Sequence, residues 1–324
     1  MTKAILIEKT GGPEVLQWKE TPLGDPGEGQ VRIRQTAIGL NYIDTYQRSG
    51  LYPVPLPGGI GQEAAGVIEA VGPGVANFNV GDRVAYAGGP PGSYAEQRVM
   101  PAAPLVKLPD NISDHQAAAI MLKGMTVQYL IRRIHPVKAG ETVLLHAAAG
   151  GVGLIACQWL KALGATIIGT VSSEEKAALA KENGCTHTII YRKEKFAERV
   201  RELTGGAGVP VVYDSVGKDT WDDSLSCLQP MGLMVSFGNT SGPVAPVNIG
   251  QLAAKGSLFV TRPALATYTA KPQDLQATAR DLFDILSSGH VKAKVSQTYA
   301  LKDAAKAHAD LEGSKTVGST ILLP

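Results

Sequence analysis

The chain has 324 residues, of which 44% are hydrophobic and 19% charged. At about 150 residues per domain this length predicts two domains, and the composition excludes an intrinsically disordered protein. The formal net charge is only +2. We therefore expect no nucleic-acid partner and no anionic-membrane partner, since either would need a concentrated basic face.

Features that direct a protein out of the cytoplasm are not evident. The amino-terminal MTKAILIEKT has too short an apolar run for a secretory signal. The weakly polar stretch 142–160 approaches the length of a membrane span, but it contains His146 and a glycine cluster. The three cysteines, Cys157, Cys185 and Cys227, lack any regular spacing, which favours buried free thiols in a reducing compartment. We expect a soluble, cytoplasmic protein.

Short apolar runs between glycine and proline turns fill roughly the first 120 residues. This pattern predicts a β-rich domain with a curled, partly barrel-like sheet or a sandwich. The expected strands are Ala4–Ile7, Val31–Ala37, Glu63–Val71 and Arg83–Tyr86.

The pattern becomes helical at Ser113, which forms a capping-box signature with Gln116. We expect Gly124 to interrupt this helix and helical spacing to resume over Thr126–Ile134. Strands and helices then alternate, which predicts a parallel, doubly wound sheet and an α/β fold. The expected strands are Thr142–Ala147, Thr166–Val171, Thr188–Ile190, Val209–Tyr213, Leu233–Phe237 and Ser257–Thr261. The expected helices are Val152–Leu163, Glu174–Glu182, Phe196–Leu203, Trp221–Cys227 and Ile249–Ala254.

After Arg262 we expect a long helix over Pro272–Ser287, a strand over Lys294–Ala300, another helix and a last strand over Ser319–Leu322. The predicted domains are therefore a β-rich catalytic domain, 1–124 with 263–324, and a dinucleotide-binding Rossmann domain, 125–262.

The strongest motif follows the strand TVLLH, where AAAGGVG leads directly into the helix LIACQWLKALG. This strand–turn–helix context is that of a dinucleotide fingerprint. Gly150 would let the backbone approach the pyrophosphate, and Gly153 would let the helix pack on the strand. The amino terminus of the following helix, expected to begin at Val152, offers unpaired N–H groups and a positive dipole end to the phosphates. Ala148 replaces the first glycine, so the turn must accept a methyl group.

The end of the next strand discriminates between the cofactors. An NAD site usually has an acid there, but this chain has Val171, followed by Ser172, Ser173 and, one helical turn later, Lys176. A hydroxyl and an ammonium group favour the 2′-phosphate of NADP. The alternative is that Glu174 serves as the acid while Lys176 is merely solvated.

No metal site is expected. Residues 1–156 contain no cysteine, no Cys-x-x-Cys occurs, and the histidines lack ligand spacing. We expect surface or capping positions rather than ligand roles for all six histidines: His115, His135, His146, His187, His290 and His308.

Several segments together resemble the medium-chain dehydrogenase/reductases, and among them the zinc-independent NADPH:quinone oxidoreductases of the ζ-crystallin-like branch. The matching segments span nearly the whole chain: GGPEVL (11–16), IGLNYIDTYQRSGLYP (38–53), GQEAAGVIEAVGPGV (61–75), GDRVAY (81–86), HAAAGGVGLIACQWLKALGA (146–165), VVYDSVG (211–217), GLMVSFGNTSG (232–242) and GSLFVTRP (256–263). Zinc-dependent relatives would have Cys near Asn41–Asp44 and His at Gln62. The resemblance therefore implies a GroES-like catalytic domain and a Rossmann domain without zinc.

The resemblance also implies which residues line an NADPH site. Those residues are Tyr42, Ile43, Asp44, Thr45, Tyr46, Tyr129, Gly151, Val152, Ser172 to Lys176, Tyr191, Val216, Thr240, Ser241, Gly242, Pro243, Ala266, Thr267, Tyr268 and Gly318. The positions of Val216 and of Thr240–Pro243, after the carboxyl ends of predicted strands, agree with where doubly wound sheets bind ligands. Aromatic packing alone is the alternative for Tyr42 and Tyr268.

The expected reaction is metal-free reduction of a quinone by NADPH. Hydride addition to a quinone or conjugated enone leaves a delocalised anion, which hydrogen-bond donors can stabilise. The candidate donors are Asn41, Tyr46, Tyr52 and Arg262, with Asp44 as their orienter; a structural hydrogen bond is the alternative for each. The runner-up activity is NADPH-dependent alkenal or enone reduction, and a different class is an RNA-binding or structural ζ-crystallin-like protein.

A homodimer is expected from the last strand of the nucleotide sheet. Leu258, Phe259 and Val260 are apolar, and no charge follows until Arg262. An uncovered apolar edge invites pairing with a second copy. The alternative is a monomer whose edge is covered by a carboxy-terminal helix.

Overall fold

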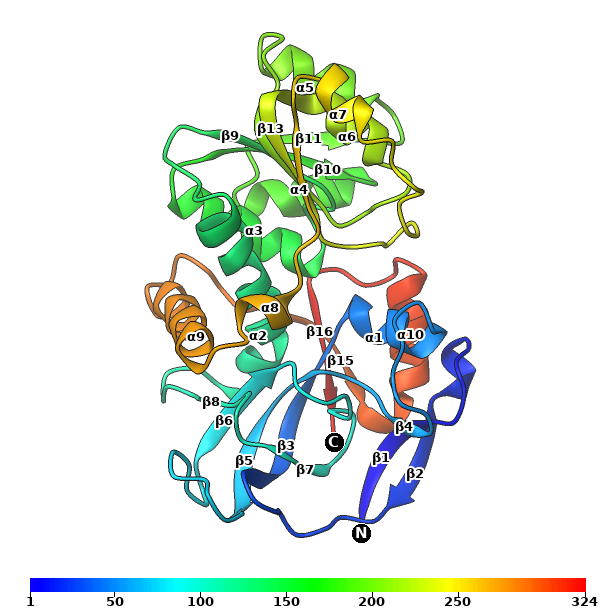
Figure 1. Ribbon diagram of the computed structural model, residues 1–324, viewed down its shortest axis with the longest axis vertical. Helices are drawn as coiled ribbons and strands as arrows, with labels where there is room; N and C mark the ends of the chain where they lie inside the picture. Colours follow the sequence, from blue (N-terminus) through cyan, green and yellow to red (C-terminus); the bar gives the residue numbers. More distant parts are fainter. The chain divides into compact units, whose positions relative to one another are not determined.

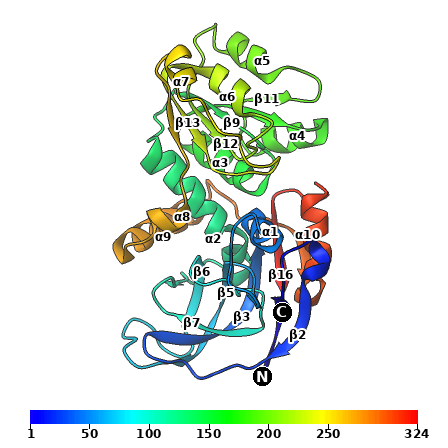
Figure 2. The ribbon, with the colours of Figure 1, turned by 45° about the vertical axis from the view of Figure 1, so that its right-hand side comes forward.

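The computed structural model describes residues 1–324, and the chain forms two compact units (Figures 1 and 2). Unit 1 comprises Met1–Met125, Thr269–Ser287 and Ala293–Pro324. Unit 2 comprises Thr126–Tyr268 and Ser288–Lys292. The domain boundaries expected after residues 124 and 262 stay a prediction.

Unit 1 contains two β-sheets and both chain termini (Figure 1). The smaller sheet has the strand order β2-β1-β4, and the larger has the order β15-β16-β3-β5-β6-β8, with β7 also paired to β3. The strands are β1 (Thr2–Ile7), β2 (Gln17–Thr21), β3 (Gln30–Leu40), β4 (Gly58–Gly59), β5 (Glu63–Val71), β6 (Arg83–Ala87), β7 (Gln97–Pro101), β8 (Val106–Lys107), β15 (Val295–Ala300) and β16 (Ser319–Leu323). The β-rich domain expected from the sequence is confirmed.

The core of unit 1 forms where the long strand β3 pairs with β5 on one side and with β7 and β16 on the other. Ile33, Ile38, Tyr86, Tyr94 and Leu322 are among the fully buried side chains of this core. Alternating buried residues along β3 place its apolar face inward, as the period of a strand requires.

Four helices complete unit 1, and one of them corrects a sequence-based expectation. The helices are α1 (Tyr42–Ser49), α2 (Asp114–Gln128), α9 (Pro272–Ser287) and α10 (Ala304–Glu312); the last residues of α2, from Thr126, belong to unit 2. The expected interruption at Gly124 is wrong, because α2 continues through this residue. A Cβ at Gly124 would lie 2.5 Å from Cδ1 of Leu282, so the glycine permits close packing of α2 on α9 rather than ending the helix.

Unit 2 is the expected parallel, doubly wound sheet. Its strand order is β11-β10-β9-β12-β13-β14, so the order reverses between β9 and β12. The strands are β9 (Thr142–Leu145), β10 (Thr166–Val171), β11 (His187–Ile190), β12 (Val209–Asp214), β13 (Leu228–Ser236) and β14 (Phe259–Thr261). Ligands of such folds bind at the carboxyl ends of the strands beside this reversal.

Helices cover both faces of the unit 2 sheet (Figures 1 and 2). They are α3 (Gly151–Ala162), α4 (Glu174–Glu182), α5 (Phe196–Leu203), α6 (Trp221–Cys227) and α7 (Gly250–Ala254), with the short α8 (Leu265–Tyr268) after the last strand. α3 packs with α4, and α5 packs with α6. A π-helical segment, Tyr129–Ile134, occupies part of the span Thr126–Ile134 over which helical spacing was expected to resume.

The cysteines are free and buried, as expected. None of the helices is both long enough and apolar enough to cross a membrane.

Candidate nucleotide and substrate site

The glycine-rich turn of unit 2 lies between β9 and α3. Ala147 adopts a left-handed conformation with φ of 53°, and Gly150 precedes the first turn of α3. A Cβ at Gly153 would lie 2.7 Å from the carbonyl carbon of Ala148. Only glycine therefore allows the helix to approach the strand this closely, and the free N–H groups at the start of α3 suit a phosphate.

The methyl group of Ala148 is accommodated by a second glycine on the neighbouring strand. A Cβ at Gly169 of β10 would lie 2.6 Å from Cβ of Ala148 and 2.6 Å from Sγ of Cys185. The replacement of the first fingerprint glycine by Ala148 is thus compensated by the absence of a side chain at Gly169.

The turn after β10 presents hydroxyl and ammonium groups. The Ser173 Oγ caps α4 by accepting a hydrogen bond from the Lys176 N–H at 3.3 Å. Ser172 and Lys176 are both half-buried. The carboxylate of Glu174 pairs instead with Nζ of Lys193 at 2.7 Å. The side chain considered as an alternative acid for NAD therefore already has a lysine partner.

The turns after β12 and β13 are held together by hydrogen bonds. Oδ1 of Asp214 accepts from the Val216 N–H at 2.7 Å. The Ser241 hydroxyl donates to the Val216 carbonyl at 2.9 Å, and the Thr240 N–H donates to the Ser215 carbonyl. Gly242 has φ of 111°, in the left-handed region. Val216 and the segment Thr240–Pro243 are thus brought together at the carboxyl edge of the sheet.

Arg262 follows β14 and reaches the same edge. Its guanidinium donates to Oγ of Ser236 at 3.2 Å and to the carbonyl of Gly238 at 2.9 Å. These contacts place Arg262 beside the end of β13.

Tyr129 and Tyr268 form a stacked pair, with ring centroids 4.6 Å apart and an interplanar angle of 10°. Burial raises the pKa of Tyr129 to about 12, so this hydroxyl is a hydrogen-bond donor at neutral pH. The guanidinium of Arg133 lies 5.1 Å from the Tyr268 ring centroid. Ala266 and Thr267 precede Tyr268 on α8, whereas Tyr191 follows β11 and is 49% exposed.

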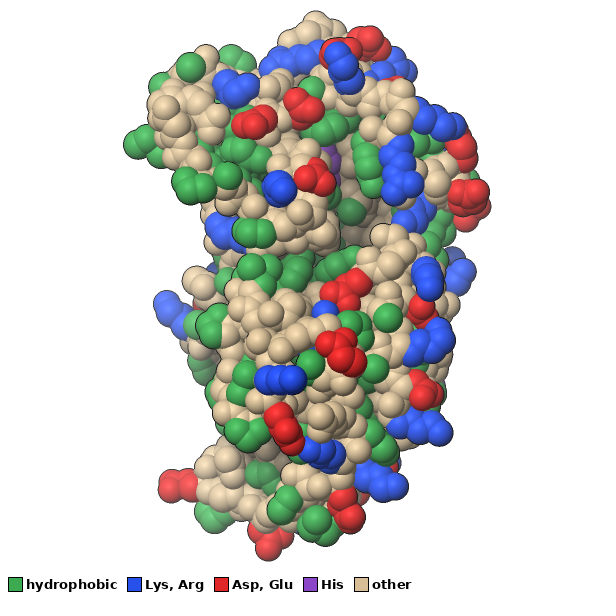
Figure 3. Space-filling model, turned by 90° about the vertical axis from the view of Figure 1, so that its right-hand side faces the viewer, with side chains coloured by type: hydrophobic (Ala, Val, Ile, Leu, Met, Phe, Trp, Pro, Cys, Tyr) green, Lys and Arg blue, Asp and Glu red, His purple; other side chains and the backbone are tan.

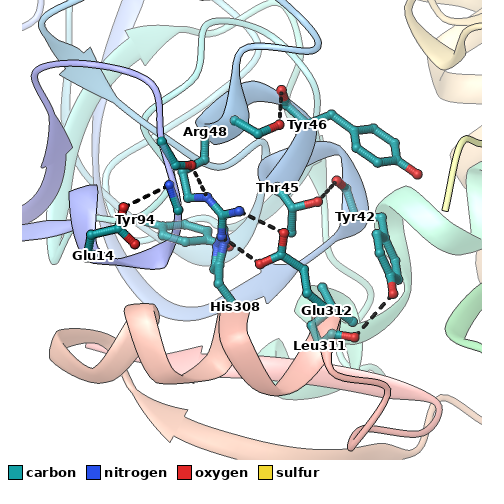
Figure 4. A network of polar contacts seen from close by, with 12 residues as sticks. Glu14, Tyr42, Thr45, Tyr46, Arg48, Tyr94, His308, Leu311 and Glu312 are labelled. Atoms are coloured by element: carbon teal, nitrogen blue, oxygen red, sulfur yellow. Dashed lines mark hydrogen bonds and ion pairs between the residues drawn. The ribbon is translucent and has the colours of Figure 1, made fainter. Parts of the chain in front are cut away.

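In unit 1, helix α1 carries the candidate residues from Tyr42 to Tyr46 (Figure 4). The Asp44 carboxylate accepts from the Asn41 N–H at 2.9 Å and so caps the helix. The Thr45 hydroxyl donates to the Tyr42 carbonyl, and the Tyr42 hydroxyl donates to the Leu311 carbonyl at 3.2 Å. This helix was not predicted from the sequence, although the Asn41–Asp44 spacing is an N-terminal capping signal.

Tyr46 packs against two other tyrosines in this part of unit 1. Its ring centroid lies 6.1 Å from that of Tyr42 and 5.3 Å from that of Tyr52. Ile43 follows Tyr42 on α1. Gly318 immediately precedes β16 and has φ of 58°. The ring of Tyr42 thus packs against Tyr46, and this packing does not prevent Tyr42 from also contacting a cofactor.

The Asn41 side chain is buried and oriented by a carboxylate. Its Nδ2 donates to Oε2 of Glu63 at 2.7 Å, and the Leu122 N–H donates to Oε1 of Glu63, also at 2.7 Å. Nζ of Lys123 lies 3.5 Å from Oε2 of Glu63. Sequence reasoning missed Glu63 and Lys123 as parts of this cluster; the only available signal was two charged residues inside apolar runs.

A second buried network connects Asp44 to the last helix of the chain, α10. Tyr94 donates to Oδ2 of Asp44 at 2.9 Å, and the Tyr94 hydroxyl lies 3.0 Å from Nε2 of His308. Arg48 contacts Nδ1 of His308 at 3.3 Å and forms a two-pronged ion pair with Glu312 (Figure 4). Burial raises the pKa of Asp44 to about 7. Burial, followed by the charge of Arg48, lowers the pKa of His308 to about 3.

The expectation of surface or capping positions is wrong for His146 and His308. Both are buried: His146 within unit 2, between Thr170 and Ser224, and His308 within unit 1, between Tyr94 and Arg48. Neighbours distant in sequence satisfy both ring nitrogens, which removes the cost of burying them. No group of three or more His, Cys, Asp or Glu side chains is arranged to hold a metal ion.

Comparison with known proteins gives two family matches and full-length relatives. The family described as "Zinc-binding dehydrogenase" matches residues 151–280, and "Alcohol dehydrogenase GroES-like domain" matches residues 27–110. A quinone oxidoreductase of Pseudomonas aeruginosa is 57% identical over 325 residues, covering 100% of both chains. A 2-haloacrylate reductase of a Burkholderia species is 48% identical, covering 100% of this chain and 99% of the relative.

Among solved structures, the Escherichia coli quinone oxidoreductase complexed with NADPH superimposes with a TM-score of 0.98. It is 51% identical to this chain, and the match covers 99% of this chain and 100% of that one.

Proposed function

Because this chain belongs to the quinone oxidoreductase family of the medium-chain dehydrogenase/reductases, we propose that it reduces quinones with NADPH. The observation that carries the cofactor assignment is the turn after β10. Ser172 and Lys176 stand there, the Glu174 carboxylate pairs with Lys193, and the Glu175 carboxylate accepts a hydrogen bond from the Ser173 side chain. The related Escherichia coli quinone oxidoreductase forms a complex with NADPH, which agrees with this assignment.

The residues of unit 2 fit a dinucleotide. Gly153 leaves space that a Cβ would fill, and α3 begins with unpaired N–H groups beside it. The proposed contacts with NADPH in unit 2 are Tyr129, Gly150, Gly151, Val152, Gly153, Ser172, Ser173, Lys176, Tyr191, Val216, Thr240, Ser241, Gly242, Pro243, Ala266, Thr267 and Tyr268. Those in unit 1 are Tyr42, Ile43, Thr45, Tyr46 and Gly318; Asp44 is completely buried and supports this segment without touching the cofactor.

NADPH, when bound, supplies the hydride; the side chains supply binding, orientation and charge stabilisation. Tyr46, Tyr52 and Arg262 are the proposed donors to the anion that develops on the substrate. Asn41 is a further candidate, with one N–H already committed to Glu63 and the other available. Asp44 is completely buried, so its proposed role is to orient α1 through the Asn41 N–H.

A steady-state substrate panel tests this function. The protein should reduce 1,4-benzoquinone and 9,10-phenanthrenequinone faster with NADPH than with NADH, and faster than it reduces a 2-alkenal. Preference for the 2-alkenal would instead favour an enone reductase, an alternative that gains weight from the 48% identity to a 2-haloacrylate reductase.

The second alternative comes from a class other than enzymes: an RNA-binding or structural ζ-crystallin-like protein. The net charge is +2, and on the face shown in Figure 3 basic and acidic side chains are interspersed. Neither feature favours phosphate-backbone binding. A titration with RNA at several salt concentrations tests this point, since backbone binding weakens steeply with salt.

Three further properties complete the proposal. The enzyme works without zinc, because the segment Asn41–Asp44 has no Cys and Gln62 stands where zinc-dependent relatives have His. It is cytoplasmic, as its buried free thiols suggest. It forms a homodimer through β14, the last strand of the sheet order, where Phe259 is 61% and Val260 39% exposed.

A further inference from the structure

A chain of buried side-chain hydrogen bonds joins three adjacent strands of unit 2. Thr170 is on β10, His146 follows β9, and Asp214 ends β12. Nδ1 of His146 lies 2.9 Å from Oγ1 of Thr170, and Nε2 lies 2.9 Å from Oγ of Ser224 on α6. The Ser224 hydroxyl donates to Oδ2 of Asp214 at 3.0 Å. All four side chains are buried.

The direction of every hydrogen bond in this chain follows from the chemistry of its members. Oδ2 of Asp214 accepts from the Ser224 hydroxyl, so the single proton of Ser224 points to Asp214. The oxygen of Ser224 must then accept, so Nε2 of His146 carries the proton. Burial lowers the pKa of His146. The ring is therefore neutral, and its Nδ1 accepts from the Thr170 hydroxyl.

Each end of the chain reaches a turn that the proposed function assigns to the cofactor. Thr170 is two residues before Ser172, at the proposed 2′-phosphate end. Asp214 accepts from the backbone N–H groups of Val216 and Gly217 at 2.7 and 3.0 Å. His146 immediately precedes the glycine-rich turn that begins at Ala147.

Packing fixes the imidazole ring as well as its hydrogen bonds. The ring of Phe196 meets it edge-on, with centroids 4.9 Å apart and an interplanar angle of 82°. A fixed ring with two committed nitrogens has one tautomer and one orientation. The separation between the ends of β10 and β12 is therefore held by side chains as well as by the backbone pairing of each with β9.

We infer that His146, with Thr170, Ser224 and Asp214, is a positioning unit that holds the 2′-phosphate turn and the Val216 turn in the geometry that binds NADPH. This inference rests on the proposed function and adds that the two turns are energetically coupled through His146. Breaking the hydrogen-bond chain near Asp214 should therefore weaken cofactor binding at the turn that contains Ser172.

The experiment measures dissociation constants for NADPH and for adenosine 2′,5′-bisphosphate, which has only the adenosine end of the cofactor. The variants are Thr170→Val, which removes one hydroxyl at almost constant volume, Ser224→Ala, and the two combined. Thr170→Ser keeps the hydroxyl. Ser226→Ala is the matched control on α6, because its hydroxyl contacts the Asp222 carbonyl and Nζ of Lys255 and no member of the hydrogen-bond chain through His146. The free energy of unfolding is measured for each variant.

Thr170→Val and Ser224→Ala should each weaken adenosine 2′,5′-bisphosphate binding about three- to tenfold, the range for loss of one hydrogen bond. The combined variant should bind no more weakly than the worse single variant, because the chain is already broken. Thr170→Ser and Ser226→Ala should bind like the wild type.

Unchanged bisphosphate binding by Ser224→Ala would overturn the coupling, as would unfolding free energies that fall while both dissociation constants stay constant. Additive losses in the combined variant would also overturn it. A wild-type protein that binds neither probe would overturn the proposed function itself, which distinguishes that failure from a failure of the coupling alone.

Discussion

Tyr94 donates its hydrogen bond to Oδ2 of Asp44 across 2.9 Å, and both side chains are completely inaccessible to solvent. Asp44 in turn caps α1, the helix that carries the candidate residues Tyr42 to Tyr46. The Tyr94 hydroxyl also contacts Nε2 of His308. A buried acid and a buried base are thus joined by one tyrosine, and their titrations affect stability in opposite directions.

Asp44 and His308 should give opposite pH dependences of stability. The pKa of Asp44 is about 7 in the folded chain against an ordinary 3.8, so the stability that its proton contributes is lost as pH rises through about 7. The pKa of His308 is about 3 against an ordinary 6.5, so its contribution is lost as pH falls from 6.5 towards 3. For each residue the unfolding free energy changes by at most about 1.4 kcal/mol per pH unit.

The measurement is the unfolding free energy of Asp44→Asn and His308→Gln, each minus the wild type, from pH 4 to 8. The Asp44→Asn difference should rise with pH up to about 7, and the His308→Gln difference should fall up to about 6.5. A flat Asp44→Asn difference over this range would contradict the raised pKa.

Replacing Lys176 with alanine should weaken NADPH far more than NADH. Loss of one charge-assisted contact with the 2′-phosphate costs about 1.5–3 kcal/mol, and NADH has no such phosphate. The ratio of kcat/KM for the two cofactors measures this effect. Lys181→Ala, on the exposed side of the same helix α4, is the control. An equal loss of kcat/KM with both cofactors would show that Lys176 does not contact the 2′-phosphate.

Gly169→Ala should destabilise the chain by about 1–3 kcal/mol through overpacking. The new Cβ would lie 2.6 Å from both the Ala148 methyl and Sγ of Cys185. Because Ala148 is in the glycine-rich turn, we also expect a higher dissociation constant for NADPH. Denaturant unfolding and cofactor titration measure the two effects. Gly24→Ala, where a Cβ has no neighbour within 4 Å, should change neither.

Dialysis against a strong chelator should leave quinone reduction and the melting temperature unchanged. The segment Asn41–Asp44 has no Cys and position 62 is Gln, so the Cys and His ligands of a catalytic zinc ion are missing. Elemental analysis of the purified protein gives an independent check. Stoichiometric zinc, together with loss of activity on its removal, would refute the prediction.

Lysine at both Phe259 and Val260 should convert a dimer into monomers. These side chains are exposed on the edge strand β14. Lysines of two facing edge strands would repel each other and so prevent the two edges from pairing. Light scattering measures the mass in solution. Val80→Lys changes a side chain that is 66% exposed in unit 1 and should leave the mass unchanged. A monomeric wild type, or a lysine variant that is still a dimer, would contradict an interface at β14.

Local sequence patterns were sufficient for most of the secondary structure. Helix α4 begins and ends at the expected Glu174 and Glu182, and β5 spans the expected Glu63–Val71. These elements depend on apolar periodicity and on end signals such as Ser173, all of which involve residues a few positions apart. The short helix α1 and the strands β2 and β7 were missed, because their polar residues obscure that periodicity.

The sequence by itself determined the doubly wound sheet, the glycine-rich turn and the side chains available at the end of β10, because contiguous residues specify each of them. Only the tertiary structure decided that Gly124 permits packing instead of ending a helix, and that Gly169 makes room for Ala148. It also placed His308 beside Tyr94, 214 positions away in the chain, and His146 between Thr170 and Ser224. Partnerships of this kind depend on which side chains meet when distant segments pack, and no local pattern encodes that geometry.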